Sequence, residues 1–447
     1  MTATTQLALQ RIDLADAATN ADVAATVKRL TRRGAVPNRS VRDGARAIVD
    51  AVRADPSAVR ALNERFGGGL AGGRLVIGRD ELEAATARLD PAVREALDQA
   101  IANVRRFAES QGPESKTTAV APGIDIERRW TPVDRVGCYV PGGTAPYPSS
   151  LVMTVVPARV AGVGTTVVAS PARPDGTVDD ILLGAAGLLG VDAFVVAGGA
   201  QAVAALAFGL RAEGVEPADL IVGPGNAWVT AAKLELAGEV GIDLPAGPSE
   251  GMVLAAPPAD PARVAADLIT QAEHGVDSPA ILVTTHAAFA DAVERNVAAQ
   301  LETAARAAIL ERALADHGAI VLARTLDAAI DFVNAYAPEH LSVDVEPLEE
   351  TVVRLRNAGS LFVGPWAPES AGDYATGANH VLPTGGLARG AGPLAVETFG
   401  RFMQVQRISR EGLASIRASI GVLATAEGLL AHREAVEIRF RDEDRAR

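Results

Sequence analysis

The chain has 447 residues, of which 48% are hydrophobic, and a formal net charge of −13 at pH 7. This length provides for roughly two to four domains with ample cores. The acidic balance argues against nucleic acid and against an anionic membrane surface as partners, because both attract basic patches. The one cysteine, Cys138, excludes an internal disulfide framework and a CxxC zinc site, so we expect a cytoplasmic protein. It falls in an expected buried strand, where cysteine is usually a small hydrophobe rather than a nucleophile.

Residues 1–130 have a mostly helical pattern with interspersed charges. The segment 1–34 carries three aspartates and no apolar core, so no secretory signal is expected there. The stretch from Gly67 to Gly73 matches the spacing GxGxxG of dinucleotide-binding proteins. Because it follows an amphipathic helix rather than a buried strand, we interpret it as a loop.

Residues 136–240 alternate between strand and helix patterns, with strands expected at 136–140, 165–170, 194–197 and 220–222. Thr177 is expected to cap a helix, with Asp180 as its capping-box partner. Three of the strands end in glycine turns, which are Pro141-Gly142-Gly143, Gly198-Gly199 and Gly223-Pro224-Gly225-Asn226. This repetition predicts a parallel sheet whose ligand lies at the carboxyl ends of the strands.

Backbone amides in such turns approach phosphate closely, so the three turns together favour a nucleotide-sized ligand. Each turn alone is explained as simply by ordinary turn chemistry, and the strict dinucleotide fingerprint is absent. The apolar stretch from Ile181 to Leu210 is broken by Asp192 and two glycines. We therefore expect it to fold as helix, strand and helix rather than to span a membrane.

Residues 251–364 repeat the alternation, with strands expected at 252–255, 281–284, 319–322 and 360–363. Pro261 and Gly275 frame a helix that carries Gln271 and His274 in its last turns. Residues 365–393 are rich in glycine and proline and are expected to form loops. Residues 394–447 are partly helical in pattern.

Four of the six histidines lie in short polar islands of this hydrophobic chain. The islands are Gln271-Ala-Glu-His274, Glu339-His340, Asp373 to His380, and Glu427 to His432. Imidazole binds metals in its neutral form and titrates near neutral pH. The islands therefore indicate a metal-dependent or acid–base enzyme.

Each island also has a simpler structural interpretation. Gln271 and His274 share a helical face with Leu268, so they are either ligands or the hydrogen-bonded end of a buried helix. The stretch 373–380 offers carboxylate, amide and imidazole groups in one expected loop, which is either functional or merely solvated.

Glu339 and His340 follow a proline and are expected on a loop, either as two proton acceptors or as an ordinary surface pair. Glu427 and His432 are expected in the first turns of a helix capped by Thr425, well apart around its axis. They would meet one ligand only off the helix end, and His432 is alternatively a core histidine.

Seven motifs in a fixed order resemble those of the histidinol dehydrogenase family, over roughly residues 35–436. They are Val136-Gly-Cys-Tyr139-Val-Pro-Gly-Gly143, Gly223-Pro-Gly-Asn226, Pro245-Ala-Gly-Pro-Ser249-Glu250, Gln271-Ala-Glu-His274-Gly275, Ala337-Pro-Glu-His340-Leu341, Asn379-His380-Val-Leu-Pro-Thr384 and Glu427-Gly-Leu-Leu-Ala-His432. The resemblance implies oxidation of L-histidinol to L-histidine through L-histidinaldehyde, using two NAD in sequence, as the last step of histidine biosynthesis.

The resemblance also implies a role for individual residues of this sequence. One zinc ion per subunit would be held by Gln271, His274, Asp373 and His432. His340 would be the general base and Glu339 would activate water. NAD contacts would fall on Tyr139, Gln201 and Asn226, and substrate contacts on Ser249, His380 and Glu427 beside His340 and the metal ligands.

The implied fold class is α/β, with two Rossmann-like parallel-sheet domains and small helical N- and C-terminal segments. Residues 1–34 would form the N-terminal segment, 35–138 with 251–393 the first domain and most of the zinc site, 139–250 the NAD-binding domain, and 394–447 the C-terminal segment. The implied assembly is a homodimer with shared active sites, in which Glu427 and His432 act in the partner's site.

Three competing hypotheses remain at this point. A paralogue oxidising another amino alcohol or polyol would keep the zinc set and the base, but should lose Glu427, which would recognise the imidazole. A zinc hydrolase would use the same histidines and carboxylates but gives no reason for the glycine turns. A non-catalytic metal or nucleotide binder would leave Glu339-His340 unexplained.

Overall fold

The computed structural model describes residues 9–142 and 145–441. Contacts divide the chain into two units, which are considered separately below. The first unit comprises the described parts of residues 1–111 and 133–399, and the second comprises those of 112–132 and 400–447. Gly143, which belongs to the first expected glycine turn, lies outside the described residues.

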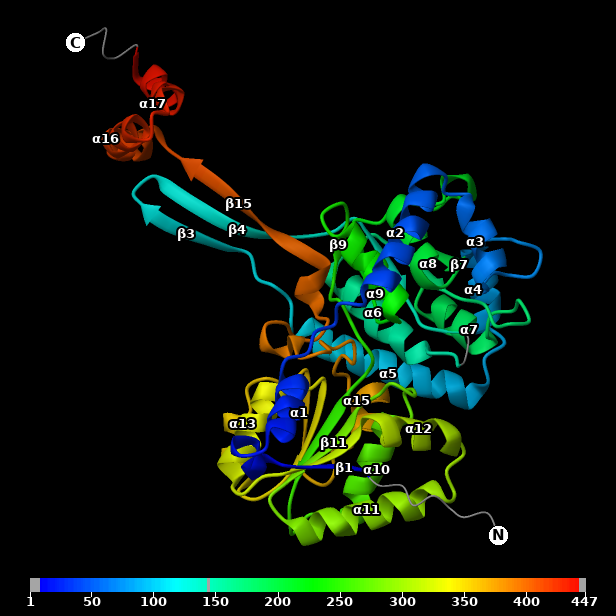
Figure 1. Cartoon of the computed structure of the whole chain (residues 1–447). Helices are drawn as coiled ribbons and strands as arrows, with labels where there is room; N and C mark the ends of the chain where they lie inside the picture. Colours follow the sequence, from blue (N-terminus) through cyan, green and yellow to red (C-terminus); the bar gives the residue numbers. More distant parts are fainter. Residues whose placement is uncertain (1–8, 143–144, 442–447) are drawn as a thin grey trace. The chain divides into compact units, whose positions relative to one another are not determined.

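The first unit contains a six-stranded parallel sheet built largely from residues 251–363 (Figure 1). Its strands, in spatial order, are β1 (Gln10–Asp13), β12 (Gly318–Leu322), β11 (Ala280–Thr284), β10 (Gly251–Ala255), β13 (His340–Asp344) and β14 (Ser360–Val363). Side chains alternate between its two faces, so Val253 packs with one core and Met252 with the other.

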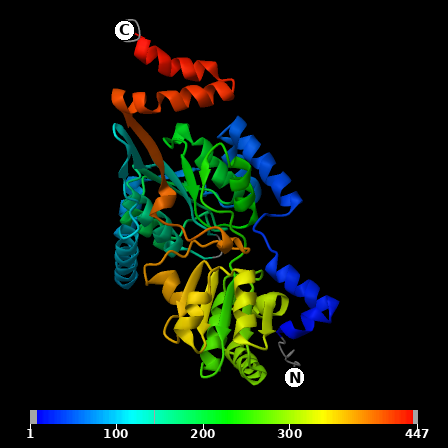
Figure 2. The same ribbon diagram turned by 90° about the vertical axis from the view of Figure 1, so that its left-hand side faces the viewer.

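Helices cover both faces of this first sheet, seen in yellow and green in Figure 2. One face is covered by α10 (Pro261–Ala272), α11 (Ala287–Leu301) and α12 (Ala307–His317). The other is covered by α1 (Ala21–Thr31), α13 (Leu326–Tyr336) and α14 (Leu348–Arg354). Burial on both faces explains why these strands read as continuous apolar runs.

A second six-stranded sheet, also in the first unit, is mixed. Its strands, in spatial order, are β2 (Val76–Gly78), β7 (Ala193–Val196), β6 (Thr165–Ser170), β5 (Arg135–Tyr139), β8 (Leu220–Val222) and β9 (Gly241–Ile242). All neighbours are parallel except β2, which runs antiparallel to β7.

Helices also cover both faces of the second sheet. One face carries α2 (Arg39–Ala54), α3 (Ala58–Phe66), α8 (Gly199–Phe208) and α9 (Ala227–Leu236). The other carries α4 (Arg79–Thr86), α5 (Pro91–Glu109), α6 (Pro148–Ala161) and α7 (Asp180–Leu188). Cys138 is fully buried in β5 among these side chains, and burial raises the pKa of its thiol to about 12. A thiol so hard to ionise suits the expectation that it is a core residue.

The second unit is an antiparallel sheet followed by two helices. The sheet has the order β15 (Gly400–Ile408), β4 (Ile124–Pro132), β3 (Lys116–Ala121). Trp130 of β4 meets Phe402 of β15 edge-on, with ring centroids 5.4 Å apart. The helices α16 (Arg410–Ala426) and α17 (Leu430–Glu437) pack on each other and appear in red in Figure 2.

The α/β class with two parallel-sheet domains is confirmed, but the structure differs from the expected division of the chain. Residues 39–109 were expected with the first sheet, yet α2 packs on α8 and α9, α4 packs on α7, and β2 pairs with β7 of the second sheet. Residues 1–34 do not form a separate segment, because β1 pairs with β12 and α1 packs on α13. A boundary at residue 139 would cut β5.

The strands expected in the two six-stranded sheets are confirmed to within one residue at each end, whereas several other strands were not expected. The missed strands are β1, β2, β3, β4, β9, β13 and β15. The expected helix cap at Thr177 is wrong, because Asp179 is the cap and its side chain accepts from the Ile181 amide. No helix in the described part of the chain is both long and apolar enough to cross a membrane.

Candidate active site

The polar islands of the first unit converge at the amino-terminal ends of β10 and β13 in the first sheet. Ser249 and Glu250 immediately precede β10, and His340 is the first residue of β13. The expected loop position of His340 is therefore wrong. Ala337, in the left-handed region at φ 55°, ends α13, and two more residues lead directly into the strand.

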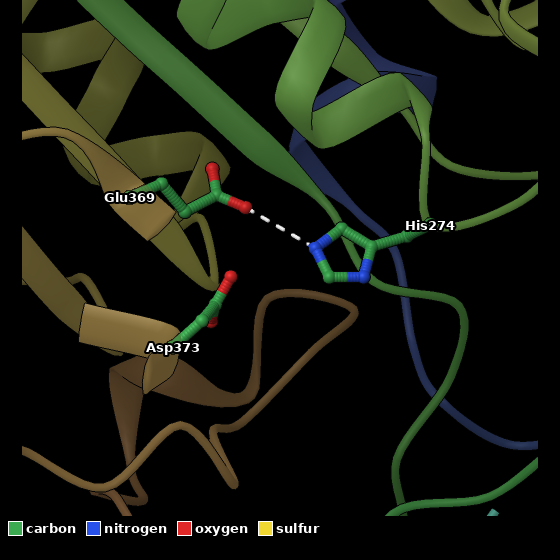
Figure 3. Close-up of side chains that lie close together, drawn as sticks. All are labelled: His274, Glu369 and Asp373. Carbon is green, nitrogen blue, oxygen red and sulfur yellow. Dashed lines mark hydrogen bonds and ion pairs between the residues drawn. The ribbon is translucent and has the colours of Figure 1, made fainter. Parts of the chain in front are cut away.

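A possible metal-binding group is formed by His274, Glu369 and Asp373, whose ligand atoms lie within 4.8 Å of one another (Figure 3). Glu369 and Asp373 are four residues apart on the short helix α15 (Glu369–Tyr374), so both point from one face. Nε2 of His274 lies 3.3 Å from Oε1 of Glu369. Partial burial lowers the pKa of His274, but its hydrogen bond and attraction to Glu369 outweigh this and raise it.

Gln271 lies beside this group in the last turn of α10, with only 1% of its surface exposed. Its Nε2 donates to Oγ of Ser249 at 3.3 Å, whereas its buried Oε1 has no hydrogen-bond partner among the described residues. A buried acceptor without a partner is costly, and a cation would satisfy it. The oxygen and nitrogen donors here suit zinc, so these residues fit the ion.

His274 itself lies two residues beyond the end of α10, rather than within the helix as expected. Pro261 occupies the start of α10 and Asp260 caps it by accepting from the Ala262 amide, so the expected start of the helix is confirmed. The chain leaves the helix at Glu273, which frees His274 to face α15.

Glu339 and His340 are two buried ionisable side chains next to the possible metal-binding group. Oε2 of Glu339 accepts the Glu250 amide at 2.9 Å and lies 3.7 Å from Nδ1 of His340. Burial raises the pKa of Glu339 to about 8, although the hydrogen bond from the Glu250 amide stabilises the carboxylate and by itself lowers the pKa. Burial lowers the pKa of His340 to about 4, so this imidazole is neutral at physiological pH.

Neither ring nitrogen of His340 has a hydrogen-bond partner within the described parts of the chain. Its ring lies parallel to that of His274, with centroids 6.3 Å apart. Nδ1 of His340 also lies 3.7 Å from Oε1 of Glu369, too far for a hydrogen bond. A neutral imidazole that is buried and has no hydrogen-bond partner among the described residues is chemically suited to accept a proton from a bound molecule.

His380 completes this cluster from the segment after α15. Its Nδ1 lies 3.0 Å from the carbonyl oxygen of Asp373, and its Nε2 lies 3.3 Å from Oγ of Ser150 in α6. Burial lowers the pKa of His380 and raises that of Asp373, although each favours the charged form of the other. The structure thus brings together every expected metal, base and substrate residue of the first unit.

The three expected cofactor residues lie at the carboxyl ends of the second sheet. Tyr139 ends β5, and its hydroxyl accepts the Gly199 amide at 3.3 Å. Gln201 is buried in the first turn of α8, with its amide 3.5 Å from Oδ1 of Asn63. Asn226 follows β8 and caps α9, where its side-chain oxygen accepts the amides of residues 228 and 229. The glycine turns after β7 and β8 therefore lie at the same edge of the sheet, with the ends of β6 and β5 between them.

Glu427 and His432 belong to the second unit, where both are exposed. Their expected place in the first turns of one helix is wrong. Glu427 is the C-cap of α16, and His432 lies in the next helix, α17. Gly428, at φ 75°, separates the two helices, so Thr425 caps neither start.

Sequence reasoning missed Glu369 and the network behind Glu339. Glu369 precedes Asp373 by four residues, and this spacing on a helix was the available signal. Glu250 holds Glu339 through its amide, and its own carboxylate pairs with Arg33 and accepts the Gly385 amide at 3.1 Å. No local pattern reveals that an arginine from residue 33 reaches this site.

The layered sheets, with buried ionisable side chains beside a group that could hold a metal ion, are typical of an α/β enzyme. A sequence model of the histidinol dehydrogenase family matches residues 31–440. The histidinol dehydrogenase of Leifsonia xyli is 48% identical over 88% of this chain and 91% of its own length. That of Nocardia farcinica is 44% identical over 98% of this chain and 99% of its own.

A structural comparison agrees with the sequence comparisons. The crystal structure of histidinol dehydrogenase from Elizabethkingia anophelis matches with a TM-score of 0.88 and 33% identity, over 98% of this chain and 99% of that one. The chain belongs to the histidinol dehydrogenase family, and it is an enzyme of the oxidoreductase class.

Proposed function

We propose that this enzyme oxidises L-histidinol to L-histidine through L-histidinaldehyde, with two NAD per substrate, as the last step of histidine biosynthesis in the cytoplasm. The observation that carries the proposal is the buried pair Glu339 and His340 beside the unpartnered oxygen of Gln271. A family membership that extends over nearly the whole chain supports it.

Zinc is the metal that we propose for the site, one ion per subunit. Gln271, His274 and Asp373 would hold it from the first unit, with His432 of a second subunit as a further ligand. The exposure of His432 in this chain supports that assignment, because an exposed imidazole is free to meet another subunit. Bound zinc would position the amine and imidazole of the substrate through its open coordination positions.

His340 would accept the proton of the substrate hydroxyl, because it is neutral above a pKa of about 4 and both its ring nitrogens are available. Glu339 would take a proton from the water that attacks the aldehyde. Its pKa of about 8 makes it a stronger base than an exposed carboxylate once it is ionised. His340 would act again when the resulting diol is oxidised.

NAD would bind over the carboxyl ends of the second sheet, near Tyr139, Gln201 and Asn226, and would accept the hydride in each oxidation. Capping of α9 uses the side-chain oxygen of Asn226, so among the described contacts its side-chain nitrogen is left for a ligand. Glycine turns that open helices support this assignment, because their backbone amides face a bound phosphate.

Substrate contacts would come from Ser249 and His380, beside His340 and the metal ligands. Glu427 of a second subunit would recognise the substrate imidazole. The proposed homodimer would therefore have shared active sites, each completed by the partner's C-terminal segment.

The test of the activity is NADH formation by zinc-loaded protein given L-histidinol and excess NAD. We expect two NADH per histidine formed, and a loss of about 10²–10⁴-fold in rate for H340N, the range of general base catalysis. H317N is the matched control, because His317 is an exposed histidine at the end of α12 and should retain full activity. Turnover of a different alcohol instead of histidinol would indicate a paralogue.

The shared site is tested by mixing two inactive variants, H340N and H432N, and allowing their subunits to exchange. If the site is shared, about half of the dimers are mixed and each mixed dimer has one intact site, which gives about a quarter of the wild-type activity. If both residues act within one chain, the mixture stays inactive.

A further inference from the structure

A buried ion pair lies directly behind the turn that follows β8. Lys233 of α9 and Asp243, which follows β9, are each 2% exposed, and Nζ of Lys233 lies 2.5 Å from Oδ1 of Asp243. Buried charges are costly and persist where a geometry must be held. Neither residue is part of the acid–base or metal-binding group, so the pair needs another explanation.

Both partners of this pair bind the backbone of one residue, Gly223. Nζ of Lys233 donates to the Gly223 carbonyl oxygen at 2.6 Å, and Oδ2 of Asp243 accepts the Gly223 amide at 2.7 Å. Three hydrogen bonds therefore close a ring around one glycine, and they satisfy the buried amide and carbonyl groups that the turn would otherwise leave unpaired.

The local structure explains how these side chains reach the turn. Helical side chains lean toward the amino end of their helix, so Lys233 extends back along α9 toward the segment that precedes it. The Asp243 amide donates to the Ile221 carbonyl at 3.2 Å, which continues the pairing of β9 with β8 and aims the carboxylate at the end of β8.

Gly223 itself cannot be replaced without moving the turn. Its φ is +112°, and a Cβ built there would lie 2.1 Å from the carbonyl oxygen of Tyr139. The turn thus lies tightly against the end of β5, and the next residues lead to Asn226 and the start of α9. A side chain at residue 223 would therefore push the turn away from Tyr139.

We infer that Lys233 and Asp243 are positioning residues for the cofactor, because they hold the turn from Gly223 to Asn226 in the shape that receives NAD. The inference rests on the proposed NAD site. Both side chains are buried and their charges cancel, so their effect on a bound cofactor would come through the geometry of the turn. Removing them should weaken NAD binding and leave the histidinol and zinc sites unchanged.

The test replaces both partners at once with K233M/D243L, because removing one would leave the other as an unpaired buried charge. We expect a Kd for NAD raised at least about tenfold and a matching rise in KM for NAD, since ångström-scale misplacement is costly. Bound zinc and KM for histidinol should stay within about twofold, because those sites lie in the other sheet. A second variant, K233Q, removes the hydrogen bond to the Gly223 carbonyl and also leaves the Asp243 carboxylate without its cation, so it should weaken NAD binding by about threefold or more.

The matched control is R159M/D192L. Nη2 of Arg159 lies 2.9 Å from Oδ2 of Asp192, which also accepts the Thr166 amide at 2.8 Å. This pair holds the backbone at the opposite, amino-terminal end of the same sheet, so its loss should lower stability without changing the Kd for NAD. NAD binding is followed by calorimetry and by the fluorescence of Trp228, which lies two residues after Asn226, with W228F to assign the signal.

Unchanged NAD binding in both K233M/D243L and K233Q would overturn the inference while leaving the proposed function intact. Equal losses in K233M/D243L and in R159M/D192L would also overturn it, because the effect would then be general destabilisation. If wild-type protein neither binds NAD nor forms NADH with histidinol, the proposed function fails instead.

Discussion

Replacing Gly251 with alanine is expected to weaken metal binding by displacing Gln271. Gly251 is the first residue of β10 and is buried against the side chain of Gln271. A Cβ built at this position would lie 2.6 Å from Cγ and 2.7 Å from Oε1 of Gln271. The unpartnered oxygen that we assign to zinc is therefore one of the atoms that a single methyl group would push away.

The displacement exceeds what a metal site tolerates. Carbon atoms pack at about 3.5–4.0 Å, so the side chain of Gln271 must retreat by roughly 1 Å. Metal–ligand distances must be held to about 0.2 Å, so the amide oxygen would no longer reach the ion. We take the loss in zinc affinity as about 10–100-fold, by analogy with the removal of groups that orient ligands. That loss corresponds to about 1.4–2.7 kcal/mol.

The assay is competition for zinc between the protein and a chromophoric chelator, with the midpoint of urea unfolding measured on metal-free protein. G137A is the matched control, because a Cβ on Gly137 of β5 would also overpack a strand, at 3.0 Å from the side chain of Leu206 in α8. Both variants should lose about 1–3 kcal/mol of stability through overpacking, but only G251A should release zinc. Wild-type zinc affinity in folded G251A would refute the placement of Gln271 as a ligand.

Three further predictions follow from other residues. E369Q should reduce zinc affinity about 10–100-fold, because the Glu369 carboxylate orients His274 and the amide is a weaker acceptor; an unchanged chelator titration would contradict this role. In metal-free protein, the pKa of Glu339 is raised from 4.5 in the unfolded state to about 8 in the folded state, so between these pH values the folded state holds a proton that the unfolded state has lost. The free energy of unfolding therefore falls as pH rises through that window. E339Q, which cannot ionise, should increase the free energy of unfolding relative to wild type more at pH 8.5 than at pH 5. Equal effects of E339Q on the free energy of urea unfolding at the two pH values would argue against a buried carboxyl with a raised pKa. F194A should cost about 3–5 kcal/mol, because Phe194 is fully buried in the second sheet, yet zinc affinity should not change; a loss under 1 kcal/mol would show that this core relaxes freely.

The parts of the fold that could be predicted are those with strong local patterns. Strands such as β6 and β8 are short apolar runs that end at glycine or proline turns, and both were found at the expected residues. The strands β3 and β15 were not predicted, because they are largely exposed and have no apolar run or regular alternation. The packing of α2 to α5 against the second sheet was not predicted for another reason. Helical periodicity reveals a buried face but not which distant sheet covers it.

The candidate site shows the same division between local and distant information. The polar islands indicated Gln271, His274 and His340 as chemically active, since a hydrophobic chain needs a reason to carry them. Their environment could not be predicted. The two shifted pKa values of Glu339 and His340 arise from burial, which depends on segments up to about 300 residues away, such as Arg33 behind Glu250. Glu369 was not predicted because its spacing to Asp373 is informative only on a helix, and α15, with six residues, is too short for a periodic pattern to reveal that helix.

The register of two neighbouring strands has a consequence for how this enzyme can change. Gly251 of β10 is paired with His340 of β13, the Glu250 carbonyl accepts the His340 amide, and the Glu250 amide holds Glu339. Inserting or deleting one residue at this point would turn every following side chain of the strand to the opposite face. Surface loops of the chain can vary in length, but the number of residues directly before these two strands is fixed by the strand pairing and by the hydrogen bonds of Glu250. Mutations that alter their number should disappear under selection even where every catalytic side chain is retained.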